Sequence, residues 1–213
     1  NGFPSSAVIQ DIVTRPDPDN IDRIISDTTA QARVEFAAKR LALVPKTFSE
    51  QGQTMFIHRI LFQERSSLAL QDALSACALY CLKNKENQVL VFRNLEQRRE
   101  RLIATTDMLL ASKVDLLEAL QALILYQIIR LFDGDIRLRA QAEADEPVLI
   151  MWAAHLKLLT HQVRRPPPGL AEATLLPEST STEWRHWIIE ESSRRTVIIA
   201  FMLKGIYNFL KLG

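Results

Sequence analysis

Residues that make turns and crosslinks are scarce in this sequence. Its 213 residues include six glycines, nine prolines and two cysteines. So few glycines and prolines argue against a β protein with many turns. The two cysteines, Cys77 and Cys81, lie four residues apart in an apolar stretch, with no histidine or further cysteine near them in sequence. Because a zinc site needs about four ligands, we expect two buried thiols in a reducing compartment and no metal.

Charge of one sign and long apolar runs are also missing. The formal net charge is +1, so the chain has no general field that would hold a nucleic-acid backbone, and nonspecific DNA binding is not expected. The longest strongly apolar run, Val197 to Leu203, is far shorter than the roughly 20 residues that span a bilayer. We therefore expect no membrane partner.

Sequence signatures of catalysis are absent too. The chain contains no GxSxG, HExxH or GxGxxG motif and no phosphate-binding GxxxxGKS or GxxxxGKT. Its four histidines are scattered, at His58, His155, His161 and His186. We expect no enzyme activity, no cofactor and no metal ion in this chain. An all-α enzyme acting on an apolar substrate is the alternative.

Helical periodicity is what the sequence does have, and it is strongest between residues 112 and 143. Ser112 and Asp115 form a capping-box pattern, which satisfies open amide groups in the first turn of a helix. Apolar residues then recur every three or four positions up to Leu131. Because nearly every side of this helix is apolar, we expect it at the centre of the fold. Asp133-Gly134-Asp135 is expected to end it.

The whole chain is predicted to be all-α, a single irregular bundle of about seven to nine helices with a long C-terminal helix. Residues 1–20 contain three prolines and are interpreted as a linker or arm, and residues 21–213 as the helical domain. A Pro-rich loop or trimmed insert is expected near 164–180, because three consecutive prolines cannot continue a helix. The helices are expected over about 21–43, 55–62, 67–82, 85–110, 112–133, 136–143, 146–162 and 180–212.

Two groups of charged residues interrupt the apolar helices. The first brackets the turn after the central helix, where an arginine fork could tie carboxylates and open helix carbonyls together. Its members are Arg130, Asp133, Asp135 and Arg137. In the last helix, a spacing of four brings Glu190 to Arg194 and Glu191 to Arg195. We interpret both groups as ion pairs that hold helices in register, with a ligand or partner site as the alternative.

Aromatic residues of the last two long helices could line a cavity for a flat apolar ligand. The candidates for this pocket are Trp152, His155, Trp184, Trp187 and Tyr207. Packing in the core is the alternative interpretation of the same residues.

Three stretches of the sequence resemble the regulatory region of fungal zinc binuclear-cluster transcription factors, in the branch often found beside secondary-metabolite genes. They are LQDALSACALYCLKNKENQVLVFRNLEQRRERLI, LEALQALILYQIIRLFDGDIRLRAQAEADEPVLIMWA and EWRHWIIEESSRRTVIIAFMLKGIY. The resemblance covers roughly residues 56–213. Its most specific parts are QALILYQIIRLFDGDIRLRAQAE and the motif WxxWIxxESxRRT. The residues of that motif are Trp184, Trp187, Ile188, Glu191, Ser192, Arg194, Arg195 and Thr196.

The resemblance implies an all-α regulatory domain of a nuclear protein, controlled by a small-molecule effector or a coregulator protein. It also implies that a six-cysteine DNA-binding domain holding zinc lies outside this chain, which starts at Asn1 without an initiator methionine and is expected to be a fragment. DNA would then be a partner only through the missing domain. Without a sustained heptad array, a monomer is plausible for this fragment and a dimer stays open.

A helical interaction scaffold with no transcriptional role is the alternative that composition alone permits. It predicts an exposed apolar stripe on the helix at 85–110 or on the one at 180–212. Burial of both stripes would remove its main support.

Overall fold

The computed structural model describes residues 18–65, 67–162 and 179–212, and in these ranges it contains eight α-helices and no strand. The all-α prediction is confirmed, and the number of helices lies within the predicted range. The long C-terminal helix is confirmed as well. The helices are α1 (Pro18–Ala42), α2 (Val44–Gln51), α3 (Arg59–Arg65), α4 (Leu68–Cys81), α5 (Gln88–Thr105), α6 (Lys113–Phe132), α7 (Ile136–Gln162) and α8 (Ser179–Leu212).

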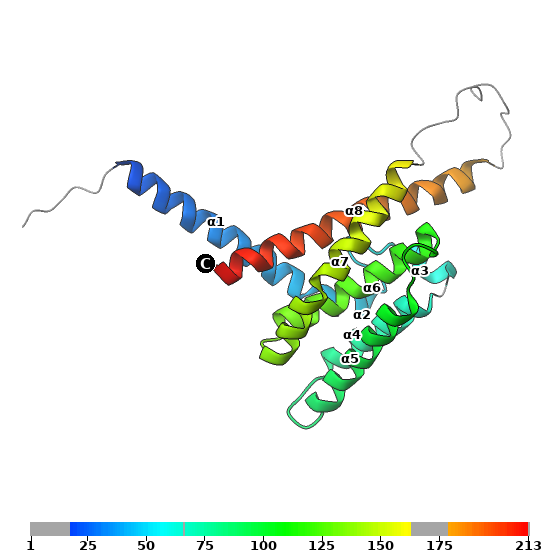
Figure 1. Cartoon of the computed structure of the whole chain (residues 1–213), viewed down its shortest axis with the longest axis horizontal. Coiled ribbons are helices and arrows are strands. Elements are labelled where there is room, and N and C mark those ends of the chain that lie inside the picture. Colours follow the sequence, from blue (N-terminus) through cyan, green and yellow to red (C-terminus); the bar gives the residue numbers. More distant parts are fainter. Residues whose placement is uncertain (1–17, 66, 163–178, 213) are drawn as a thin grey trace, which may run out of the picture.

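The central helix of the bundle is α6, as its sequence predicts. The Ser112 hydroxyl accepts a hydrogen bond from the Asp115 backbone N–H at 3.2 Å and so caps the first turn. Every residue from Leu116 to Leu131 is buried. Helices α1, α2, α4, α5, α7 and α8 all contact α6. Figure 1 shows α4 and α5 side by side below it, with α7 and α8 crossing above.

Polar side chains on this buried helix are tied to neighbouring elements. The Gln121 amide donates to the Phe56 carbonyl at 2.7 Å and to the Thr196 hydroxyl at 3.2 Å. The Gln127 amide donates to the Ala142 carbonyl at 3.0 Å. Because a buried polar group is costly unless it is hydrogen-bonded, these contacts fix the rotation of α6 against α7 and α8.

Helix α7 corrects one prediction, since residues 136–143 and 146–162 form one continuous helix with Pro147 inside it. A proline in a helix interior removes one backbone hydrogen bond and normally breaks or kinks the helix. Here the flanking turns are held by packing, because Ala142, Leu149 and Trp152 all belong to the main core. The tendency of Pro147 to break the helix is outweighed by the burial of residues on both sides of it.

A second correction concerns the region around Pro45. The proline does follow the end of α1, but it also lies in the first turn of α2, where its missing N–H is harmless. Residues 49–51, expected in a loop, are helical because Val44 and Phe48 anchor this short helix in the core. The helix ends at Gly52, whose positive φ of 64° favours glycine.

Other boundaries shift by a few residues. The short helix expected at 55–62 is α3, at Arg59–Arg65, and the helix expected at 85–110 is α5, which ends at Thr105. Helix α1 begins at Pro18, inside the expected arm, and the rest of that arm lies outside the described residues. Most of the expected proline-rich loop near 164–180 also lies outside them.

The two cysteines do not share one environment, which corrects the expectation of two buried thiols. Cys77 is fully buried, and burial raises the pKa of its thiol. Cys81 is exposed, and its sulfur lies 3.6 Å from the Ser49 hydroxyl.

Within the described ranges, no three His, Cys, Asp or Glu side chains gather as metal ligands would. None of the described helices has a long enough apolar stretch to cross a bilayer.

Candidate functional site

Arg130 is the most deeply buried charged residue of the described bundle. Its side chain is 0% exposed, and its guanidinium donates to Asp145 Oδ2 at 2.6 Å and to Gln127 Oε1 at 3.0 Å. Burial lowers the pKa of Arg130, and the hydrogen bond to Asp145 opposes that shift. Asp145 also accepts from Arg99 at 3.5 Å. This cluster joins α5, α6 and α7.

The other residues of the first charged group do not join Arg130. Asp133 pairs with Lys83, and the Asp135 carboxylate accepts from the Leu138 backbone N–H at 2.8 Å, which caps α7. Arg137 pairs with Glu96 of α5 at 3.3 Å. The predicted fork over the turn is therefore three separate contacts, each to a different element.

The second charged group, in α8, is brought together around Glu191. The Arg194 guanidinium donates two hydrogen bonds to the Glu191 carboxylate, at 2.7 and 2.8 Å, and Arg195 donates a third at 2.7 Å. These bonds, from Arg194 first and then Arg195, lower the pKa of Glu191 to about 2. Glu190 instead pairs with Lys113 at the start of α6. The predicted contact of Glu191 with Arg195 is confirmed, whereas Glu190 does not use Arg194.

The five residues proposed for an aromatic pocket are dispersed over the bundle. Trp152 is buried in the main core, and the Tyr207 hydroxyl donates to the Glu143 carboxylate. His155 is half-buried on α7. Trp184 packs edge-on against His58, with 6.3 Å between the ring centroids. Trp187 is 61% exposed. The described part of the chain does not show one cavity lined by all five.

Trp187 instead lines a groove of about 720 Å³ between α7 and α8. Its apolar surface comes mainly from Trp187, Ile198 and Phe201, whose side chains are 61%, 49% and 42% exposed. Lys157 and Thr160 contribute from α7. Exposed large apolar side chains that lie together often mark a binding site.

Charged groups surround the apolar part of this groove. They are Glu183, Glu190, Glu191 and Arg194, and the imidazole of His186 lies among them. Trp187 and Glu191 also line a smaller hollow of about 290 Å³ beside residues 53–58, where Arg195 donates to the Met55 carbonyl at 3.4 Å. The Trp187–Glu191 turn of α8 is thus shared by two hollows. This groove unites one residue of the predicted aromatic set, Trp187, with three of the charged group predicted in the last helix, Glu190, Glu191 and Arg194.

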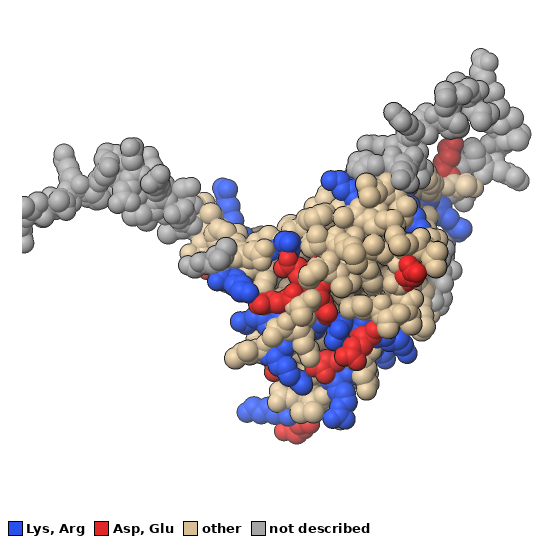
Figure 2. All heavy atoms as spheres, in the orientation of Figure 1, with Lys and Arg blue, Asp and Glu red and all other residues tan. Residues whose placement is uncertain are grey.

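The charge pattern of the surface agrees with a local apolar site. Figure 2 shows Lys and Arg intermixed with Asp and Glu over the lower part of the visible face, without a large area of one sign. Uncharged residues cover most of its upper part, where α7 and α8 cross.

Sequence reasoning missed several charged partners, among them Lys83 and Glu96 and, most clearly, Asp145 and Lys113. Asp145 is 15 residues from Arg130, and Lys113 is 77 residues from Glu190. The residues of each pair lie on different helices, so their separation in sequence gives no local signal that identifies either pair. A buried arginine in an apolar helix was the available signal that some carboxylate must lie opposite it.

Comparison with known proteins found one strong similarity. The chain is 67% identical over all 213 residues to a protein of Penicillium aethiopicum named transcription factor gsfR2. The match covers 51% of that protein, so the chain spans about half the length of the curated relative it matches. No protein-family model matches the chain. No solved structure matches it either.

Proposed function

We propose that this chain is a regulatory segment of a fungal transcription factor. One observation carries the proposal. The chain is 67% identical over its whole length to a protein named as a transcription factor. At this level of identity over every helix, the two segments are expected to share a fold and a role. The resemblance to the zinc binuclear-cluster regulators points the same way.

In this proposal the segment regulates and another part of the full-length protein reads DNA. A net charge of +1 gives the segment little attraction for phosphates. Zinc would be bound by the DNA-binding domain, and the full-length protein would act in the nucleus. We propose no catalytic role for the segment.

Regulation would work through the groove between α7 and α8. An effector or coregulator shifts a protein between two conformations only if it binds one of them more tightly. Trp187, Ile198 and Phe201 offer an apolar surface, and Glu191 with Arg194 offers charged groups beside it. Both α7 and α8 contact the central helix, so a molecule held between them acts directly on the core.

Chromatin immunoprecipitation of the full-length protein tests the general proposal, with enrichment at discrete promoters as the expected result. If no promoter were enriched, the proposal would be contradicted.

The groove is tested by Trp187→Ala and Phe201→Ala in the full-length protein, with target transcripts as the readout. We expect several-fold changes, because both side chains are exposed and their loss should leave the fold intact. Trp184→Ala is the matched control, an exposed tryptophan of α8 that does not line the groove.

One observation favours the second candidate, an interaction scaffold without a transcriptional role. Helix α5 buries Val91, Phe92, Leu95 and Leu102 but exposes Val89 and Leu90. Helix α8 keeps a larger exposed apolar set, comprising Trp184, Trp187, Ile198, Phe201, Phe209 and Leu210. Under this alternative, the groove variants would leave every transcript unchanged. Their effect would be confined to the assembly of a protein complex.

A further inference from the structure

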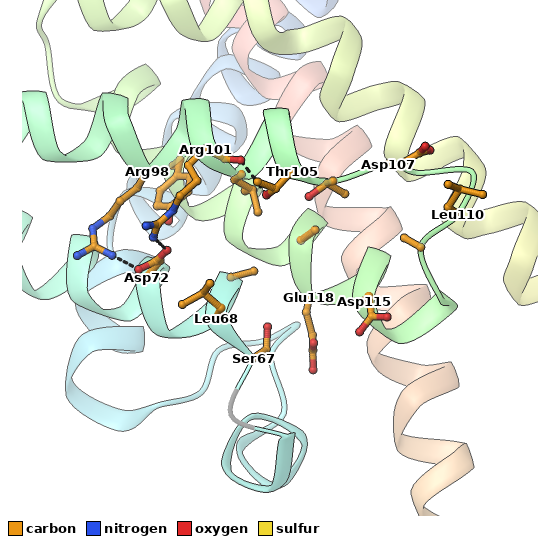
Figure 3. A pocket seen from close by; sticks show the side chains of 16 residues that line it. Ser67, Leu68, Asp72, Arg98, Arg101, Thr105, Asp107, Leu110, Asp115 and Glu118 are labelled. Carbon is orange, nitrogen blue, oxygen red and sulfur yellow. Dashed lines mark hydrogen bonds and ion pairs between the residues drawn. The ribbon is translucent and has the colours of Figure 1, made fainter.

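A second pocket, of about 580 Å³, lies between α4, α5 and α6, and it shares no lining residue with the α7/α8 groove. Figure 3 shows side chains from all three helices converging on it, with Asp72 of α4 and Arg101 of α5 at one end and Asp115 and Glu118 of α6 at the other. Its volume is in the range of sites for drug-sized molecules.

Tyr126 of α6 is the most deeply buried of the residues that line this pocket. Its side chain is 1% exposed, and its hydroxyl makes no hydrogen bond with any described residue. Burial and the nearby Asp72 raise the pKa of Tyr126, so the hydroxyl keeps its proton and remains a donor at neutral pH. Because Tyr126 lines the pocket, its hydroxyl can act as a donor to a molecule bound there.

Charged groups of both signs act on the same hydroxyl, because Asp72 raises the pKa of Tyr126 whereas Arg98 and Arg101 lower it. Arg98 and Arg101 both donate to the Asp72 carboxylate, which leaves a net charge of +1 on the three groups together. Arg98 also donates to Asn94 Oδ1 at 2.9 Å. Arg101 donates to Asp72 through one nitrogen, and its side chain is half-exposed. The Arg101 guanidinium therefore has N–H groups available for an anionic oxygen.

The rest of the pocket gives a ligand its orientation. Ala69, Leu102 and Ala119 supply an apolar wall. Asp115 and Glu118 line the far end, where an anion would meet like charge. Tyr126 is 11 residues along α6 from Asp115, which corresponds to about 16 Å of helix. A molecule with its acidic end at Tyr126 would keep that end away from Asp115 and Glu118.

We propose that this pocket binds a small organic acid with an apolar body, whose carboxylate accepts hydrogen bonds from the Tyr126 hydroxyl and the Arg101 guanidinium. The proposal deepens the proposed function, since such an acid bridging α4, α5 and α6 would be an effector. Binding itself does not depend on a transcriptional role, and the two are tested separately.

The test uses 4-phenylbutyrate as the probe, added to the isotopically labelled full chain and followed by amide chemical shifts. The neutral 4-phenylbutan-1-ol and the cationic 4-phenylbutylamine are matched probes with the same apolar body. We expect saturable binding of the acid, with shifts concentrated at residues 67–72, 98–111 and 115–119. The alcohol should bind at least tenfold more weakly, because a charge-assisted hydrogen bond is lost.

Two variants separate the proposed contacts. Tyr126→Phe removes only the hydroxyl and Arg101→Gln removes an exposed charge, and each should weaken binding of the acid about tenfold. Arg93→Gln, an exposed arginine of α5 away from the pocket, is the control and should leave the affinity unchanged. Urea midpoints of all three variants confirm that the fold is intact.

Three results would overturn the proposal. One is equal binding of the acid and the alcohol, and another is tighter binding of the amine. The third is a set of shifts that maps to Trp187 and Phe201, which would place the acid in the α7/α8 groove. None of these results bears on promoter enrichment of the full-length protein, so each proposal can fail alone.

Discussion

Arg130 in α6 and Arg194 in α8 are both paired with a carboxylate, yet their surroundings differ completely. Arg130 is buried and meets Asp145 of another helix, whereas Arg194 is mostly exposed and meets Glu191 one turn away on its own helix. A charge in a buried site is expensive unless its partner stays in place. A solvent-exposed pair is weakened by water and salt and contributes little. The first pair, together with Arg99, therefore links three helices, and the second is available for other contacts.

Removing the buried partner should have the largest effect. Asp145→Asn leaves Arg130 charged among apolar residues and should lower the free energy of unfolding by about 3 kcal/mol. Urea denaturation of both proteins measures this difference. The control is Glu146→Gln at the adjacent position. Glu146 pairs with Lys204, with 2.7 Å between the two charged groups, and both side chains are more exposed than those of Arg130 and Asp145. That variant should lose less than about 1 kcal/mol, and equal losses would contradict the contrast between buried and exposed pairs.

Removing both buried charges should cost less than removing one. In Arg130→Met combined with Asp145→Leu, no buried charge is left without its partner. Gln127 then loses the hydrogen bond it accepts from Arg130, so the recovery is incomplete. We expect the double variant to regain about half of the roughly 3 kcal/mol lost by Asp145→Asn. A double variant less stable than the single one would show that the pair is a net source of stability.

The smallest effect is expected at the exposed cluster. Glu191→Gln should lower the free energy of unfolding by less than about 1 kcal/mol, and 1 M salt should remove most of that difference. The stability of Asp145→Asn relative to the original chain should change much less with salt. A loss at Glu191 comparable to the loss at Asp145 would break the comparison.

The same variant has a defined pH dependence. The pKa of Glu191 is lowered from 4.5 to about 2 by the hydrogen bonds from Arg194 and Arg195. The folded state therefore favours the ionised carboxylate, and the stabilisation is complete above pH 4.5 and is lost as the pH falls toward 2. The difference in urea midpoint between the original chain and Glu191→Gln should shrink over this interval. A difference that is constant from pH 6 to pH 2.5 would mean that the carboxylate is not paired in solution.

Much of the fold could be predicted because its signals are local. The cap at Ser112, the apolar run through α6 and the stop after Phe132 all lie within a few residues of the structure they specify. The helix through Pro147 was not predictable in this way. Its continuity depends on the core that Leu149 and Trp152 enter, and that core is built by residues far away in sequence.

Candidate sites show the same limit more sharply. Trp187 and Glu191 were both singled out from the sequence, but their common groove became visible only once α7 was in place beside α8. Tyr126 gave no sign of a role, because as an aromatic residue in an apolar helix it looked like core. Its unpaired hydroxyl matters only because α4 and α5 leave a pocket in front of it.

By itself, the sequence determined the all-α class, the central helix and contacts such as Glu191 with Arg195, since helix propensity, caps and pairs one turn apart act over a few residues. Only the tertiary structure decided that Arg130 meets Asp145, that Cys81 is exposed while Cys77 is buried, and where the two pockets lie. These features depend on which faces of separate helices meet. That choice is made by the packing of the whole core, to which every helix contributes and which no single stretch encodes.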